Sequence, residues 1–205
     1  MLTSALLVLW VDWATAGPLE QAKSAYEAKD YATAFSIWRP LAEEGNAEAQ
    51  LFVGVLLDNG LSVSRDHREA VSWYRKAAAQ GNAQAEYRLG LALIHGSDGV
   101  TRDLPQGLSL MEKAGDDGYV HSFYVLGSLF RAGRWGVPED ATKSTAWFRK
   151  AADQGDEASQ ATLGIDYQYG RGVAKDVNQA ISWYRKAAAQ GNAMARDALV
   201  ELGEK

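Results

Sequence analysis

The sequence predicts an all-α protein built as a solenoid of antiparallel helix pairs, and three observations support this fold class. One glycine position recurs every 36 or 37 residues along most of the chain. The phrase SWYRKAAAQGNA occurs twice, at 72–83 and 182–193. Further glycine and aspartate positions recur in the same register. A fixed period of about 20 to 50 residues is typical of solenoids, because each unit buries its apolar face only by stacking on its neighbours.

The repeat is defined by a marker glycine and three positions that follow it. The markers are Gly45, Gly81, Gly118, Gly155 and Gly191. Nine residues later the chain has Gly54, Gly90, Gly127 and Gly164, and fifteen residues later it has Gly60, Gly96, Gly133 and Gly170. A loop then ends at Asp66, Asp103, Asp140 and Asp176. Because the extra residue of the longer periods falls in this loop, the helices keep a constant length.

Each unit is expected to contain two antiparallel helices. In the second helix of the first full unit, the apolar positions follow the i, i+3, i+4, i+7, i+8 template of one buried face: Ala70, Trp73, Tyr74, Ala77 and Ala78. Asp66 stands at the N-cap position of this helix, and Glu69 follows at capping-box spacing. The Gln-Gly-Asn turn then supplies a left-handed glycine and an asparagine cap for the next helix.

The first helix of each unit carries the ninth-position glycine, which predicts a close approach of the paired helices. Glycine inside a helix costs about 1 kcal/mol relative to alanine, and close packing is the natural compensation. The unit 82–118 departs from the others. It has Leu110 and Met111 instead of an aromatic pair, and Gly107 where Ala70 and Ala180 stand. We expect looser packing in this unit.

The amino-terminal segment, residues 1–17, is interpreted as a signal peptide. Met1 to Val11 is almost continuously apolar, and Ala14-Thr15-Ala16 is a small-x-small cleavage pattern that predicts cleavage after Ala16. No basic residue precedes the apolar run and Asp12 interrupts it, so two alternatives stay open: a short amphipathic helix that caps the fold, or a start downstream of a missing basic segment. A run of eleven residues is shorter than the roughly 20 that span a bilayer.

Composition excludes several classes of protein. With 47% apolar and 23% charged residues the chain is expected to fold, and its net charge of −5 disfavours nucleic acid and anionic membranes as partners. Without cysteine there is no disulfide scaffold or thiolate site, and the three histidines have no metal-binding spacing. We therefore expect no metal, no cofactor and no membrane span in the mature chain. The oligomeric state stays open.

The motifs resemble those of the SEL-one-like repeat (SLR) family, a tetratricopeptide-related α-solenoid. The resemblance rests on Gly-Asn-Ala-x-Ala-x-Tyr-x-Leu-Gly at 81–90, Gly-x-x-Gly-Val-x-x-Asp at 133–140 and Ala-x-x-Trp-Tyr-Arg-Lys-Ala-Ala at 70–78. It implies one right-handed α/α superhelical solenoid over 18–205. We divide that solenoid into an entry hairpin at 19–44, repeats at 46–81, 82–118, 119–155 and 156–191, and a C-terminal capping helix at 192–205.

The resemblance implies a non-catalytic adaptor that binds a protein or peptide in a bacterial envelope or host-interaction context. The predicted location is periplasmic or secreted, or cytoplasmic if residues 1–17 are not a signal peptide. A structural spacer within a larger envelope assembly is the main alternative. A hydrolase of cell-wall glycan or β-lactam is disfavoured, because no paired carboxylates or Ser-x-x-Lys motif stand in a suitable context. The penicillin-binding activity of the cysteine-rich branch of the family is not transferred to a chain without cysteine.

Partner-binding candidates lie on the first helices and in one loop. If the array binds as tetratricopeptide arrays do, its concave face is lined by residues three, six, ten and thirteen after each marker. The candidates from this stripe are Glu48, Gln84, Tyr87, Leu91, His121, Tyr124, Arg131 and Gln168. Tyr87 and Tyr124 are equally consistent with packing between repeats. Arg134 and Trp135 replace small or charged residues in one loop, and an exposed Trp beside an Arg is typical of a binding hot spot. That Trp is also consistent with packing over the neighbouring hairpin.

Overall fold

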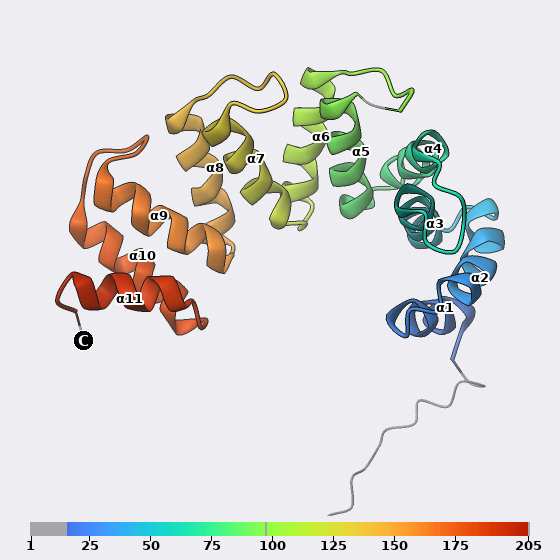
Figure 1. The fold of residues 1–205 in the computed structure, drawn as a ribbon, viewed down its shortest axis with the longest axis horizontal. Coiled ribbons are helices and arrows are strands. Elements are labelled where there is room, and N and C mark those ends of the chain that lie inside the picture. The colour runs from blue at the N-terminus through green and yellow to red at the C-terminus, as the bar shows by residue number, and fades with distance from the viewer. Residues whose placement is uncertain (1–15, 97, 205) are drawn as a thin grey trace, which may run out of the picture. The chain divides into compact units, whose positions relative to one another are not determined.

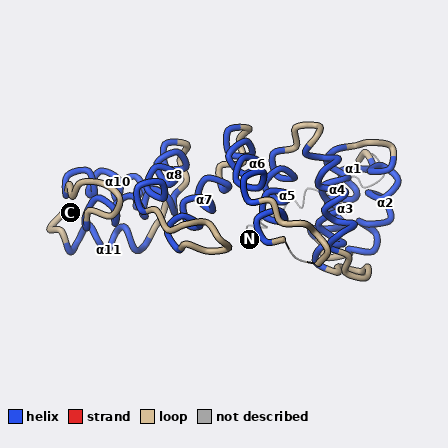
Figure 2. The backbone as a smooth tube through the Cα atoms, turned by 90° about the horizontal axis from the view of Figure 1, so that it is seen from above, coloured by secondary structure: helices blue, strands red, loops and turns tan. Residues whose placement is uncertain are grey.

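The computed structural model describes residues 16–96 and 98–204, and within these ranges it contains eleven helices and no strand (Figure 2). This confirms the predicted all-α class. The chain divides after Gln80 into two compact units, here called unit 1 (residues 1–80) and unit 2 (residues 81–205). The prediction of a single domain over 18–205 stays a prediction.

Unit 1 contains two helix hairpins, coloured blue to teal in Figure 1. The first pairs α1 (Pro18–Glu27) with α2 (Tyr31–Glu43), and the second pairs α3 (Ala47–Asn59) with α4 (His67–Ala78). The first hairpin is closed by a stack of aromatic rings in which Trp38 and Phe52 lie 4.4 Å apart and nearly parallel. Trp38 is fully buried.

Unit 2 contains three helix hairpins and a final single helix, coloured green to red in Figure 1. The hairpins are α5 (Ala83–His95) with α6 (Leu104–Asp116), α7 (His121–Ala132) with α8 (Ala141–Asp153), and α9 (Glu157–Tyr169) with α10 (Val177–Ala189). The final helix, α11 (Ala193–Glu201), packs mainly on α10.

The predicted helix caps are confirmed. The side chains of Asp66, Asp103, Asp140 and Asp176 each accept a hydrogen bond from the backbone N–H three residues later. Asn46, Asn82 and Asn192 do the same for the first helices that they precede. The one first helix of unit 2 without a side-chain cap is α7, because Tyr119 stands where the other units have Asn or Asp. Such a cap contributes about 1 kcal/mol.

The glycines at the ninth position bring the two helices of each hairpin into contact, as predicted. The space beside Gly54 is filled by the ring of Tyr74, and that beside Gly164 by the ring of Tyr184. The expectation of looser packing in the unit 82–118 is wrong. Gly107 lies against Gly90, and a Cβ on Gly107 would be only 2.7 Å from the Gly90 carbonyl oxygen. The small residue allows the backbones to approach more closely.

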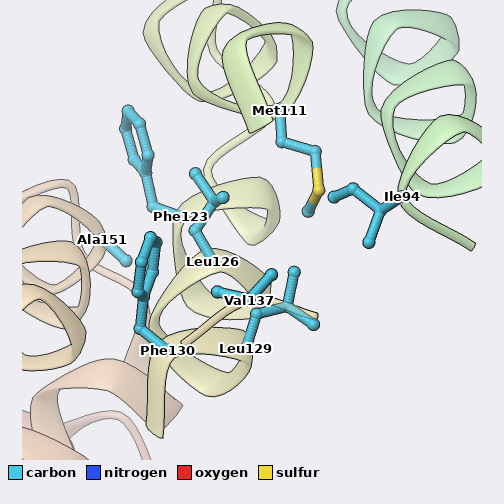
Figure 3. Close-up of a cluster of buried hydrophobic side chains, with 8 residues drawn as sticks. All are labelled: Ile94, Met111, Phe123, Leu126, Leu129, Phe130, Val137 and Ala151. Atoms are coloured by element: carbon cyan, nitrogen blue, oxygen red, sulfur yellow. The ribbon is translucent and has the colours of Figure 1, made fainter. Parts of the chain in front are cut away.

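A buried apolar cluster in unit 2 joins the hairpins α5–α6 and α7–α8 (Figure 3). The tips of Met111 of α6 and Ile94 of α5 point toward each other beside α7, which contributes Leu126 and, on the side away from Ile94, Phe123. All four side chains are almost completely buried. The hairpin α5–α6 therefore completes its core with side chains from the hairpin that follows it, as expected within a solenoid.

Among the described helices, none is long and apolar enough to cross a membrane. The predicted signal peptide lies almost entirely in residues 1–15, outside the described residues, and stays a prediction.

Candidate functional site

Four rings meet at one end of α7 in unit 2. Tyr87 of α5, Tyr119 of the turn before α7, and His121 and Tyr124 of α7 form what we call the aromatic cluster. The centroids of Tyr87 and Tyr119 are 5.0 Å apart, and those of His121 and Tyr124 are 5.8 Å apart in a stacked arrangement. His121 is exposed and the three tyrosines are half-buried. The cluster thus combines one exposed ring, that of His121, with three tyrosines that are partly covered.

The aromatic cluster also takes part in packing between repeats. Tyr87 contacts the buried core of Figure 3, and Tyr124 lies 5.6 Å from the ring of buried Phe148. Burial, and to a smaller extent the neighbouring Tyr119, raise the pKa of the Tyr87 hydroxyl. The sequence predicted Tyr87, His121 and Tyr124 but missed Tyr119. The replacement of the expected cap residue by Tyr was the signal that pointed to it.

Trp135 lies beyond the other end of α7. Its side chain is 45% exposed, and its backbone has a φ of 51°, in the left-handed region. The equivalent residues of the other loops, Ser62, Asp98 and Gly172, also have positive φ. Glycine adopts this conformation without strain and short polar residues tolerate it, whereas a bulky residue is an outlier there. Unlike its equivalents, Trp135 therefore combines an unfavourable backbone with a large exposed apolar surface.

Contacts from the preceding hairpin hold Trp135 in place. The guanidinium of Arg102 donates a hydrogen bond to the Trp135 carbonyl oxygen. The ring of His95, at the end of α5, meets the indole edge to face with centroids 3.8 Å apart. The predicted packing of the indole on the neighbouring hairpin is therefore seen, and nearly half of its surface stays exposed. The role of Trp135 as a binding hot spot stays a prediction. Arg134, beside it, is exposed.

Arg131 connects two repeats through a buried polar network. Its guanidinium lies 2.7 and 2.5 Å from the two carboxylate oxygens of Asp166, which is completely buried on α9. Thr145 of α8 contacts the same carboxylate at 2.9 Å. Burial raises the pKa of the Asp166 carboxyl, and Arg131 and Thr145 oppose this shift. An Asp at a register position where other repeats have Leu or Ala was the sequence signal for this network.

The other predicted residues are dispersed. Glu48 lies in unit 1, where its carboxylate pairs with Lys23 at 2.9 Å. Gln84 is half-buried at the start of α5, and Leu91 packs against the buried core. The side-chain oxygen of Gln168 accepts a hydrogen bond of 2.7 Å from the Tyr184 hydroxyl. Partner binding by these residues, and by Arg131, stays a prediction.

The described residues contain no group of acidic, histidine or cysteine side chains arranged to hold a metal ion. What unit 2 offers instead is exposed aromatic surface at both ends of α7. The two ends of this twelve-residue helix are about 18 Å apart.

The model of the Sel1 repeat matches four segments of the chain, residues 47–82, 83–119, 124–156 and 158–192. No curated protein matches the chain. Among solved structures, a protective antigen present in uropathogenic Escherichia coli strains, displaying an SLR fold, is 32% identical with a TM-score of 0.77. That similarity covers 91% of this chain and 41% of the antigen, so this chain spans less than half of its length.

Two further solved structures are similar. A Sel1 repeat protein from Oxalobacter formigenes is 32% identical with a TM-score of 0.74, over 88% of this chain and 73% of that protein. A sel1 repeat protein from Klebsiella pneumoniae is 20% identical with a TM-score of 0.60, over 91% and 92% of the two chains. The family match, the helix hairpins and the recurring caps agree, and the chain belongs to the Sel1 repeat family.

Proposed function

We propose that this protein is a non-catalytic adaptor that binds a protein or peptide partner through the repeat centred on α7. Sel1 repeat proteins generally serve as protein–protein interaction scaffolds. The observation that carries the proposal for this chain is Trp135, a large apolar side chain that is 45% exposed although its backbone is left-handed. A bulky residue in this conformation costs about 1–2 kcal/mol, and nearly half of the Trp135 surface nevertheless stays exposed to solvent.

The opposite end of α7 supports the same conclusion. Tyr119 replaces the cap residue, which costs the helix about 1 kcal/mol, and adds its ring to the aromatic cluster. Local rules of stability are broken mainly at functional sites. Tyr and Trp are also the residues that contribute most at protein interfaces, because they bury large areas at low entropic cost.

We place this adaptor in the bacterial envelope or outside the cell. The apolar amino-terminal run with its small-x-small pattern supports export. The similar protein from uropathogenic Escherichia coli is a protective antigen, which is consistent with a Sel1 array that reaches the cell surface or the exterior.

The test is affinity capture from the native envelope fraction with the wild-type chain and with a Tyr87→Ala, Tyr124→Ala, Trp135→Ala variant. We expect the triple variant to lose a partner that the wild type captures. A control with Arg75→Ala and Ser182→Ala, both exposed on second helices, should retain it. Because Tyr87 and Tyr124 also pack against the core, circular dichroism must show that the triple variant is folded, and Trp135→Ala alone should reproduce part of the loss.

Identical partners for wild type and the folded triple variant would refute this choice of surface. If the isolated protein captures nothing while its deletion disrupts a larger complex, the chain is a structural spacer instead.

A further inference from the structure

A groove lies between α9 and α11 at the carboxyl-terminal end of unit 2. Its volume is about 480 Å³. Ile165 and Gln168 of α9 line one wall, and Met194 and Asp197 of α11 line the other. Tyr169, Arg171, Tyr184, Ala198 and Glu201 complete the lining. This groove is far along the chain from the α7 repeat and shares only Gln168 with the predicted binding residues.

The α11 wall of the groove is formed by the same first-helix positions that were singled out in the complete repeats, continued into the last half repeat. Counted from Gly191, Met194, Asp197 and Glu201 stand at positions three, six and ten. In the complete repeats, positions six and ten are apolar or uncharged: Leu51 and Val55, Tyr87 and Leu91, Tyr124 and Ser128, Ala161 and Ile165. Carboxylates at these two positions are therefore confined to α11.

The two carboxylates have no basic partner among the described residues. Asp197 and Glu201 are four residues apart, so their side chains occupy the same face of α11, and both are exposed. Arg171, the one basic side chain in the groove lining, lies over the ring of Tyr169 at 5.3 Å. Arg185 is paired with Glu204 outside the groove. The two α11 carboxylates therefore outnumber the one guanidinium, and the groove lining carries a net charge of −1.

Two other members of the lining, one on each side of the groove, are large, apolar and exposed. Tyr169 is 61% exposed and Met194 is 44% exposed, which makes them two of the most exposed large hydrophobic side chains of the described structure. A terminal helix with a polar, solvated outer face accounts for the two carboxylates. It does not account for the exposed Tyr and Met side chains on the two sides of the groove. Side chains of this kind indicate a surface that is covered when a partner binds.

We propose that this groove binds an extended peptide segment that alternates apolar and basic side chains. The apolar side chains pack against Ile165, Tyr169 and Met194, and the basic side chains pair with Asp197 and Glu201. Charge complementarity selects this occupant, because a segment with acidic side chains would place like charges against α11. The site is separate from the α7 repeat, and neither proposal depends on the other.

The test uses methyl-labelled methionine, because the chain has only three methionines. Met194 lies in the groove and Met111 is completely buried in the core, so the two methyl resonances report on binding and on folding separately. The probes are the capped pentapeptides Leu-Lys-Leu-Lys-Leu and Leu-Glu-Leu-Glu-Leu, titrated into the full-length protein, with Met194→Leu to assign the signal.

We expect the lysine peptide to shift the Met194 resonance saturably, without moving Met111, and the glutamate peptide to leave Met194 unchanged. The Asp197→Asn, Glu201→Gln variant should bind the lysine peptide about tenfold more weakly. A matched variant, Asp153→Asn with Glu157→Gln, removes the same charge outside the groove and should bind as the wild type does. High salt should weaken binding to the wild type.

The proposal is wrong if Met194 does not respond to the lysine peptide, if both peptides shift it equally, or if the two variants bind alike. The Tyr87→Ala, Tyr124→Ala, Trp135→Ala variant should still bind the lysine peptide. Failure of the α7 proposal and failure of the groove proposal are therefore distinguishable.

Discussion

The two copies of SWYRKAAAQGNA share their glutamine and lysine contacts, whereas the repeat 119–155 departs from its neighbours at both ends of its first helix. In the first copy, Gln80 donates hydrogen bonds to the Gly45 carbonyl at 3.0 Å and to the Gln50 side chain at 2.8 Å. In the second copy, Gln190 donates to Gly155 at 2.9 Å and to Gln160 at 2.8 Å. In both copies, the glutamine therefore joins the end of the second helix to the turn that precedes the first helix of the same repeat.

The cationic side chains of the phrase are also placed alike. Lys76 lies 3.9 Å from the centre of the Trp73 ring, and Lys186 lies 3.8 Å from that of Trp183. Repeated residues thus maintain the architecture. In the repeat 119–155, by contrast, Tyr119, Arg131 and Trp135 each replace a residue that the other repeats use for capping, packing or a tight loop. Specialised contacts and exposed surface are found where the repeats differ.

The largest effect is expected from Arg131→Ala. This change leaves the Asp166 carboxylate buried without its cation, and breaking a buried pair in this way costs about 3–5 kcal/mol. Arg185→Ala, which breaks an exposed pair, should cost less than about 1 kcal/mol. Urea unfolding measures both values. Equal losses of unfolding free energy would show that the pair of Arg131 and Asp166 stabilises the contact between its two repeats no more than an exposed ion pair does.

The same variant should show a defined pH dependence. Because burial raises the pKa of Asp166 in the folded state, folding favours the protonated carboxyl. The contribution of this group to stability is complete below its unfolded pKa and is lost as the pH rises through the folded pKa. Without Arg131 the folded pKa rises further, so the loss caused by Arg131→Ala should be larger at pH 7 than near pH 4.

A medium effect is expected from the glutamine clamps. Gln80→Ala and Gln190→Ala both remove the hydrogen bonds to the marker-glycine carbonyl and to the first-helix glutamine, which have similar geometry in the two copies. Each change should lower the free energy of unfolding by about 1–2 kcal/mol. The comparison predicts equal losses for the two copies. Chemical denaturation of the two single variants measures these losses. A difference above about 1 kcal/mol would show that the identical sequence does not contribute equally to stability in its two copies.

The smallest effect on stability is expected from Trp135→Asp, which installs the residue found at position 98 of the preceding loop. Asp tolerates the left-handed backbone better than Trp, and this gain offsets the lost contact with His95. The free energy of unfolding should change by less than about 0.5 kcal/mol. A decrease of about 2 kcal/mol or more in the free energy of unfolding would show that Trp135 stabilises the fold through its packing.

Much of this fold could be predicted because the same residue types recur at the same positions in several repeats, which identifies their structural roles more reliably than one occurrence would. The aspartate and asparagine caps, the left-handed glycines and the Tyr74–Gly54 contact all follow from residue type and register. Contacts between residues with no shared register signal could not be predicted. The carboxylate of Asp166 pairs with an arginine 35 residues earlier, and Gly107 tightens a hairpin that its sequence suggested was loose.

The candidate site was predicted less completely than the fold. Spacing identified Tyr87, His121 and Tyr124 as neighbours, but whether a half-buried ring packs or binds depends on its surroundings, which the sequence does not give. Tyr119 was missed because it stands at the cap position, outside the first-helix positions that were followed. The α11 carboxylates were missed because those positions were followed only through complete repeats. In each case the signal was a residue that departs from the repeat.

The central claim is that the partner contacts the part of the array that differs between repeats. A photo-crosslinking amino acid placed at position 135 or, as a control, at position 72 tests this in living cells. Ser72 is exposed and begins the repeated phrase. We predict that the probe at 135 yields a specific crosslinked product that the probe at 72 does not. Crosslinking to the same protein from 72 but not from 135 would contradict the account.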